Sequence, residues 1–202
     1  MNKTWDDFLP LITPYLPTCP DAVIKRHLAV TAVDFFVRTH LWREDIDPIY
    51  VSPGVYEYDL DAEAYVEDLI SVVVDRRELE HTDMRLIPND QRYDTGFPTK
   101  YWVHSDNSIR LHPIPDTPVV LKLAAVLRPS RSATSIPAWV FELWAETIVA
   151  GTIDRLASIP GKDWSDMSLA QHNRLHYEQG ITAARVRDTR GVGHTVQMRP
   201  FA

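Results

Sequence analysis

The spacing of apolar residues changes twice along this chain of 202 residues, and that change constrains the fold more than any other feature. Near both ends, apolar residues recur every three or four positions, which is the period of an amphipathic helix. The middle instead carries short β-branched and aromatic runs separated by turn-forming residues. The sequence therefore predicts helices at both ends and β-structure between them.

The N-terminal part predicts one short helix and one long helix. Thr4 and Asp7 have the spacing of a helix cap, so a short helix is expected after Thr4. The long helix is predicted at about 22–41, with Asp21 as its N-cap residue. Its apolar series is Ile24, Leu28, Ala32, Phe35 and Trp42.

Two further helices are predicted near the C-terminal end. One spans about 137–159, with Pro137 in its first turn and Ser135 as its cap. The other spans about 165–187, and the link between the two is short. Helices joined in this way pack as an antiparallel hairpin. We expect burial of Phe35, Trp144 and Ile148 where the three long helices meet.

The β-rich middle is divided by proline, glycine, asparagine and aspartate. Ser52–Gly54 is expected to form a turn, 105–108 a hairpin loop, and the polar stretch 78–98 a loop or finger. The predicted strands are Ile49–Val51, Val55–Leu60, Leu69–Val74, Tyr101–His104, Ile109–His112 and Val119–Leu127.

The predicted fold class is α+β: a helical bundle of about three main helices, with an inserted β-rich region and an extended C-terminal arm. We expect a single domain over 1–190. Its helical parts are 1–43 and 135–190, and its β-rich insert is 44–134. Residues 191–202 follow as an extended tail.

Composition narrows the function classes. The lone Cys19 excludes an intramolecular disulfide and a cysteine-rich zinc site. No segment is apolar for the roughly 20 residues that span a bilayer, and the N-terminus lacks a secretory signal pattern, so no membrane association is expected. Net charge is −7, yet 181–202 carries four arginines against one aspartate. A basic end on an acidic body favours docking to an acidic protein surface.

The candidate chemical motifs are weak. His172 and His176 are four residues apart on a predicted helix, as in zinc proteases, but no glutamate lies between them and no third ligand is evident. Two surface histidines are the favoured interpretation. Trp139 and Trp144 on one helix are better explained by core packing than by ligand stacking.

Acidic residues form two clusters that a hydrolase could use as acid and base. Both flank turns, where solvated carboxylates are ordinary. The clusters are Glu44, Asp45 and Asp47, and then Asp59, Asp61, Glu63, Glu67 and Asp68. No nucleophile elbow and no glycine-rich phosphate loop occurs, so we expect no enzyme, no metal and no cofactor.

Four stretches, in their order along the chain, resemble the head-to-tail adaptor (connector) proteins of tailed bacteriophages. The likeness is to the short-tailed type that includes the tail tubular A protein, and it spans nearly the whole chain. The stretches are Trp5-Asp6-Asp7-Phe8-Leu9-Pro10; Leu41-Trp42-Arg43-Glu44-Asp45-Ile46-Asp47-Pro48; Ile109-Arg110-Leu111-His112-Pro113-Ile114-Pro115 before a strand ending Leu127-Arg128-Pro129-Ser130; and Ile136-Pro137 opening a helix that ends Arg155-Leu156, with Pro160 and Trp164 beyond.

This resemblance implies a structural protein of the virion, located at the head-tail junction after synthesis in the host cytoplasm. Adaptors of this type form a ring of about twelve copies beneath the portal protein. The implied partners are the portal, a tail nozzle or tail tube protein, and other copies of the chain. Genomic DNA would pass through the lumen without sequence-specific binding.

The resemblance also implies that Gly180–Ala202 becomes an arm docked on the portal. Gly191 and Gly193 disfavour helix there, which suits a segment that a partner orders. A frayed terminus that docks nothing is the alternative. The implied portal-binding residues are Arg185, Arg187, Arg190, Val192, Val196, Met198, Arg199 and Phe201.

Two other functions stay open at this point. A carboxylate-based hydrolase requires that the acidic clusters converge in a pocket. A small phage scaffold or regulatory protein would act as a monomer or dimer and would be missing from mature virions.

Overall fold

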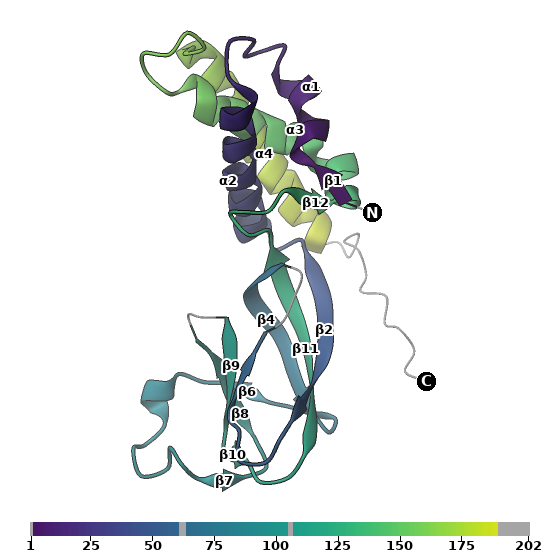
Figure 1. Ribbon diagram of the computed structural model, residues 1–202, viewed down its shortest axis with the longest axis vertical. Coiled ribbons are helices and arrows are strands. Elements are labelled where there is room, and N and C mark those ends of the chain that lie inside the picture. The colour runs from purple at the N-terminus through teal and green to yellow at the C-terminus, as the bar shows by residue number, and fades with distance from the viewer. Residues whose placement is uncertain (1, 61–63, 105–106, 190–202) are drawn as a thin grey trace. The chain divides into compact units, whose positions relative to one another are not determined.

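The structure is a computed structural model that describes residues 2–60, 64–104 and 107–189. Helices occupy the two ends of the chain and strands occupy its middle, so the protein is of the mixed α+β class, as predicted (Figure 1). None of the helices in these ranges is both long and apolar enough to cross a membrane.

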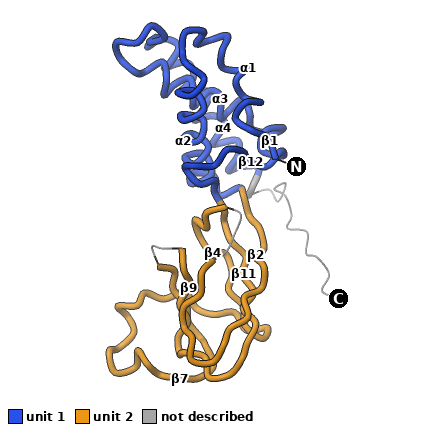
Figure 2. Tube along the Cα trace, viewed as in Figure 1, with its two compact units in different colours: residues 1–41, 128–195 blue, residues 42–127, 196–202 orange. Residues whose placement is uncertain are grey.

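The chain divides into two compact units (Figure 2). The helical unit contains the residues up to Leu41 and those from Arg128 to the end of the last helix, and the β unit contains Trp42–Leu127. Whether the chain folds as a single cooperative domain stays a prediction.

The helical unit is built from four helices, one 3-10 turn and a two-stranded ladder. Strands β1 and β12 pair antiparallel, with Lys3 opposite Ile136. The elements are β1 (Asn2–Thr4), η1 (Trp5–Phe8), α1 (Leu9–Ile12), α2 (Asp21–Thr39), β12 (Ser135–Pro137), α3 (Ala138–Ala157) and α4 (Met167–Thr189).

The helices lie near their predicted positions, but both predicted caps of long helices are wrong. Pro20 occupies the cap position of α2 and Asp21 is its first residue. Pro137 precedes α3, because Ser135 pairs with Thr4 in the β1–β12 ladder. At the N-terminus, the Thr4 N–H does donate to Asp7 Oδ2 at 2.8 Å, as the cap spacing predicts.

Helices α2, α3 and α4 pack on one another through a shared apolar core. Phe35 and Ile148 are fully buried and Trp144 is 8% exposed, which confirms the three predicted core positions. The Phe35 and Trp144 rings lie 5.8 Å apart. Trp139, on the same helix, approaches the ring of Phe36 at 6.4 Å. The structure therefore supports core packing by both tryptophans.

Two glycines allow the helices to approach closely. A Cβ added to Gly180 of α4 would lie 2.4 Å from the side chain of Thr147 on α3. A Cβ on Gly151 would lie 2.7 Å from the ring of Tyr177. No real side chain tolerates such distances, so α3 and α4 can pack this closely only because glycine is present at these positions.

The β unit contains two four-stranded sheets and a short parallel pair, β7–β10. The sheet orders are β2-β11-β4-β5 and β3-β9-β8-β6. The elements are β2 (Arg43–Val51), β3 (Glu57–Asp59), β4 (Tyr65–Val74), β5 (Arg77–Glu78), β6 (Glu80–His81), η2 (Met84–Leu86), β7 (Thr95–Gly96), β8 (Lys100–Val103), β9 (Ser108–His112), β10 (Ile114–Pro115) and β11 (Val119–Arg128).

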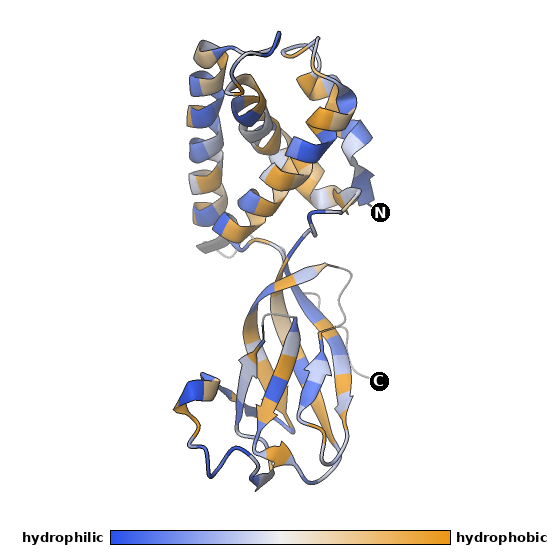
Figure 3. Cartoon of the chain, turned by 60° about the vertical axis from the view of Figure 1, so that its left-hand side comes forward, coloured by the Kyte–Doolittle hydropathy of each residue, from blue (hydrophilic) through white to orange (hydrophobic). Residues whose placement is uncertain are grey.

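Residues from both sheets form one apolar core. Val72 and Leu121 of one sheet and Ile109 and Leu111 of the other are at most 1% exposed. Hydrophobic and hydrophilic residues alternate along these strands, as a half-buried sheet requires (Figure 3). The β2–β11 register is interrupted between Leu121 and Leu123, opposite Pro48, whose nitrogen cannot join the ladder.

The stretch 78–98, predicted to be a loop or finger, is tied down at both ends. Strand β6 pairs with β8 and β7 pairs with β10, both in parallel. Between them Ile87 is buried, whereas Leu86 is 75% and Tyr93 82% exposed. The segment is therefore an anchored loop that presents large side chains to solvent.

Replacing Trp144 by alanine should lower the free energy of unfolding by about 3 to 5 kcal/mol, because a large core side chain would leave a cavity. Denaturant titration measures the change. Leu143→Ala is the matched control, because Leu143 is 41% exposed on the same helix. Equal losses of stability in the two variants would contradict the assignment of Trp144 to the core.

Gly180→Ala should destabilise the protein by about 1 to 3 kcal/mol, because the new methyl group meets Thr147. Adding Thr147→Ala should restore part of the loss. Thermal melts of the two single variants and the double variant give the coupling energy. A Gly180→Ala protein as stable as the wild type would contradict the packing described above.

Candidate functional site: two grooves beside the α3–α4 pair

A groove opens where α2, α3 and α4 meet, with a volume of about 840 Å³. We call it the α2 groove. Helix α2 contributes His27, Val30, Asp34 and Arg38, which lie three or four positions apart and therefore share one face. Helix α3 contributes Gly151, Asp154 and Arg155, and Ser158 follows just after its end. Helix α4 contributes Arg174, Tyr177 and Glu178.

Asp34 is the hub of a polar network in this groove. Its Oδ2 accepts a 2.7 Å hydrogen bond from the hydroxyl of Tyr177. The same oxygen lies 3.4 Å from Arg155 and 3.8 Å from Arg38. Burial, followed by the bond to Asp34, strongly raises the pKa of the Tyr177 phenol, so this hydroxyl stays protonated and donates. One carboxylate thus joins all three long helices.

Arg38 extends the network toward the end of α4. Its guanidinium makes a two-bond contact with Glu178, one bond measuring 2.8 Å, and it lies 5.7 Å from the ring centre of Tyr177. These hydrogen bonds lower the pKa of Glu178. The Arg185 Nε–H donates to the Arg38 carbonyl at 2.7 Å and satisfies an acceptor in the last turn of α2.

The opposite end of the α2 groove carries surplus positive charge. Burial, together with the charges of Arg155 and Arg26, lowers the pKa of His27. Arg174 lies 3.3 Å from Asp154, and Arg26 makes no ion pair with any described residue. The groove as a whole contains four arginines against three carboxylates. An anionic group is therefore the chemistry that this end can accept.

A second groove, of about 440 Å³, lies between α1, α3 and α4 and is called the α1 groove. Leu11, Tyr15 and Glu146 line it together with His172 and His176. The two histidine rings lie 4.5 Å apart on the exposed side of α4. No set of three histidine, cysteine or acidic side chains that could hold a metal is found within the described ranges.

The two acidic clusters occupy different strands of the β unit. In the first, Glu44, Asp45 and Asp47 are exposed along β2, and Glu44 accepts a 2.9 Å bond from the Trp42 indole. In the second, Asp59 and Asp68 are exposed and Glu67 is half-buried. Asp61 and Glu63 lie outside the described residues. Apart from half-buried Glu67, the described carboxylates are therefore in the solvated positions that the sequence favoured.

Of the predicted portal-binding residues of the arm, only two lie among the described residues. Arg185 and Arg187 belong to α4, which continues to Thr189. Ile181 and Ala184 are buried, so the prediction of an arm that starts at Gly180 is wrong. The helix continues because its apolar stripe still packs in the helical unit. The other predicted portal-binding residues lie outside the described residues: Arg190, Val192, Val196, Met198, Arg199 and Phe201.

The Asp34 network was not predicted from the sequence. The i,i+4 spacing of Asp34 and Arg38 was a usable signal, but Tyr177, Arg155 and Glu178 lie more than 100 positions away. Comparison with known proteins adds nothing to the assignment: no protein-family model matches the chain, and no curated protein matches it.

His27 makes stability depend on pH. Because burial and two arginines depress its pKa below 6.5 in the folded state, the unfolded state binds more protons, and stability is lost as the pH falls below about 6.5 toward the folded value. His27→Gln should flatten this part of the stability curve. The curve keeps a slope of the same sign, because burial also lowers the pKa of His112.

Urea titrations between pH 7 and pH 5 measure the effect. His172→Gln, at an exposed position of α4, is the matched control. If His27→Gln and the wild type lose stability in parallel on acidification, the electrostatic account of the α2 groove is wrong.

Proposed function

We propose that this chain is a structural adaptor that joins the head of a tailed bacteriophage to its tail. In this proposal about twelve copies form a ring beneath the portal protein. The partners are the portal above, a tail nozzle or tail tube protein below, and neighbouring copies at each side. The protein acts in the virion at the head-tail junction, is not an enzyme and needs no cofactor.

The finer architecture belongs to the same proposal. A bundle of about three helices would carry a β-rich insert, and an extended arm would follow. The chain leaves the helical unit at Leu41 and returns at Arg128, which is the connectivity of an insert. Such an arrangement lets one unit build a ring while the other contacts a different partner.

The observation that carries the proposal is the anchored loop of the β unit. Leu86 and Tyr93 are 75% and 82% exposed, and Met84, the first residue of η2, is 38% exposed. Large exposed side chains carried by one anchored loop favour a protein-protein contact, in which a contiguous apolar patch is covered. A partner surface would remove them from water.

The distribution of charge along the chain favours a ring that conducts DNA and that docks to the portal through its C-terminal end. The last 22 residues carry a net charge of +3, which leaves −10 for the rest of the chain. An acidic lumen would not hold DNA phosphates through counterion release. Arg187 at the end of α4 and the arginines at 190 and 199 would pair with portal carboxylates, with Val192, Val196, Met198 and Phe201 as apolar anchors. Arg185 is already bonded to Arg38 and would contribute less.

The decisive measurement is the copy number of this chain in purified virions of the phage that encodes it. Quantitative mass spectrometry should find about one ring, near twelve copies per particle. A scaffold or regulatory protein would be missing from mature particles. Absence of the chain from virions would refute the adaptor role.

Deleting residues 191–202 should leave the melting temperature nearly unchanged and abolish attachment to portal rings. The reason is that α4 packs on α3 through residues that precede the deleted segment, such as Tyr177, Ile181 and Ala184. Raised salt should also weaken the wild-type complex, because part of the contact is ionic. Replacing the same residues by a glycine-serine tail of equal length controls for chain length. If the truncated protein binds portal rings with wild-type affinity, the tail is not part of the portal contact.

A further inference from the structure

The two grooves lie on different sides of the α3–α4 pair. Successive residues of a helix are rotated by about 100°. On α4, His172 and His176 therefore point to one side and Arg174 and Glu178 to another. The residues of α3 divide in the same way: Glu146 and Ile153 line the α1 groove, whereas Asp154 and Arg155 line the α2 groove. The helical unit thus offers two unlike faces.

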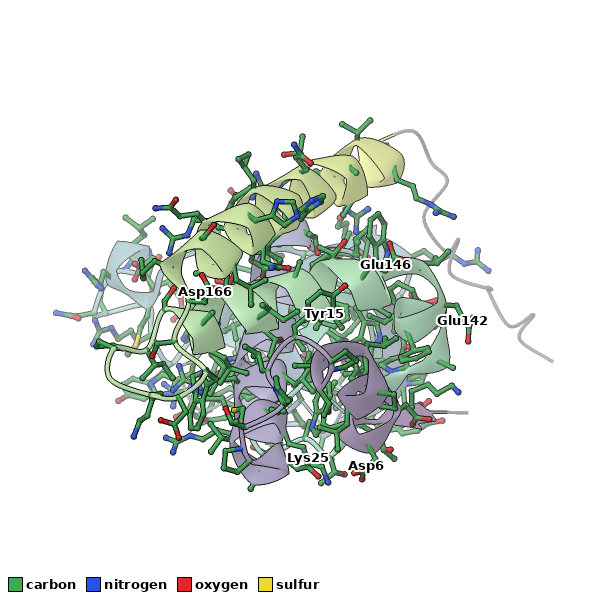
Figure 4. The ribbon with its side chains drawn as sticks, turned by 90° about the horizontal axis from the view of Figure 1, so that it is seen from above. Asp6, Tyr15, Lys25, Glu142, Glu146 and Asp166 are labelled. Carbon is green, nitrogen blue, oxygen red and sulfur yellow. The ribbon has the colours of Figure 1, made fainter. Side chains whose placement is uncertain are left out.

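The face beside the α1 groove carries unpaired negative charge. Glu142 and Glu146 follow one another by one turn along α3, both exposed (Figure 4). Neither makes an ion pair or hydrogen bond with a described residue. By contrast Asp6, also labelled in Figure 4, is paired with Lys25 at 2.6 Å. Tyr15 and Leu11, which line the α1 groove together with Glu146, are 57% and 40% exposed.

The face beside the α2 groove is its complement. Arg26 is exposed and unpaired within the described ranges, and the guanidinium of Arg155, which lines the same groove, adds to the positive potential around it. Val30, in the same groove, is 38% exposed and offers apolar surface. One face therefore presents carboxylates around an aromatic and an aliphatic side chain, and the other presents guanidinium groups around a cavity.

We propose that these two faces bind each other between neighbouring copies of the chain. Glu142 and Glu146 of one copy would lie against Arg26 and Arg174 of the next, and Tyr15 would enter the α2 groove. This inference rests on the proposed ring, because a closed ring requires a heterologous contact between two different surfaces. A two-fold dimer would bring like faces and like charges together.

The contact is suited to assembly on a template. Exposed ion pairs contribute little individually, and the apolar area offered by Leu11 and Tyr15 is small. Isolated copies would therefore meet only transiently. When the portal holds the copies side by side, each contact becomes effectively intramolecular and the ring is reinforced. Charge complementarity supplies the direction in which copies follow one another.

Chemical cross-linking can trap such transient contacts. Cys19 is buried, so new cysteines at exposed positions react selectively. Protein with Ala22→Cys, one turn before Arg26, is mixed with protein with Leu143→Cys, beside Glu142, and treated with a short bismaleimide. The mixed 22–143 product should exceed the 22–22 and 143–143 products several-fold and should fall as salt is raised.

Charge exchange then tests the pairing itself. Glu142→Arg with Glu146→Arg in the Leu143→Cys protein should reduce the mixed product to the level of the like products. Adding Arg26→Glu with Arg174→Glu to the Ala22→Cys protein should restore it. Asp163→Arg, on an exposed loop, is the control for a change of net charge and should have no comparable effect. Circular dichroism melts verify that every variant is folded.

Equal yields of mixed and like products, or no rescue by the second charge exchange, would overturn the proposed contact. That result leaves the adaptor role standing if virions contain the chain at ring stoichiometry. Conversely, charge-dependent mixed cross-links with a chain missing from virions would support the contact between copies and refute the adaptor role.

Discussion

The packing of three helices around Phe35 and Trp144 is the interaction on which the rest of the helical unit depends. The two rings bury large apolar surfaces, and glycines at 151 and 180 let α4 approach α3 closely. The Asp34 network is a consequence of that approach. Tyr177 reaches Asp34 only because Gly151 leaves room for its ring.

The same packing creates surfaces as well as a core. Two helices in contact leave a furrow on each side, and α2 and α1 border the two furrows differently. On one side most polar side chains bond to one another, and arginines are in excess at one end of the groove. On the other, Glu142 and Glu146 pair with no residue that the structure describes, and Glu146 lines the groove with exposed Tyr15. A unit with unlike faces suits head-to-tail association, in which every copy uses both faces.

The β unit follows a separate logic. Its two sheets share one core, which neither sheet could form by itself, and its strands therefore alternate apolar and polar residues. What distinguishes it is the loop between β6 and β7, held by strand pairing at both ends while Leu86 and Tyr93 stay in solvent. These exposed side chains are the surface that the proposed partner contact would cover.

By itself the sequence determined the mixed α+β class, the places of the three long helices and the strands Leu69–Val74 and Val119–Leu127. It also predicted the burial of Phe35, Trp144 and Ile148. These features could be predicted because hydrophobic periodicity is a local property of the sequence. It misplaced the caps at Asp21 and Ser135, where a neighbouring proline or strand pairing outweighed the residue's own preference, and it placed the start of the C-terminal arm too early, at Gly180, although the predicted helix itself ran to about 187. Only the tertiary structure decided the candidate site. Asp34, Arg155 and Tyr177 are brought together from distant positions, and Glu142 is left unpaired, through helix packing that no local pattern encodes.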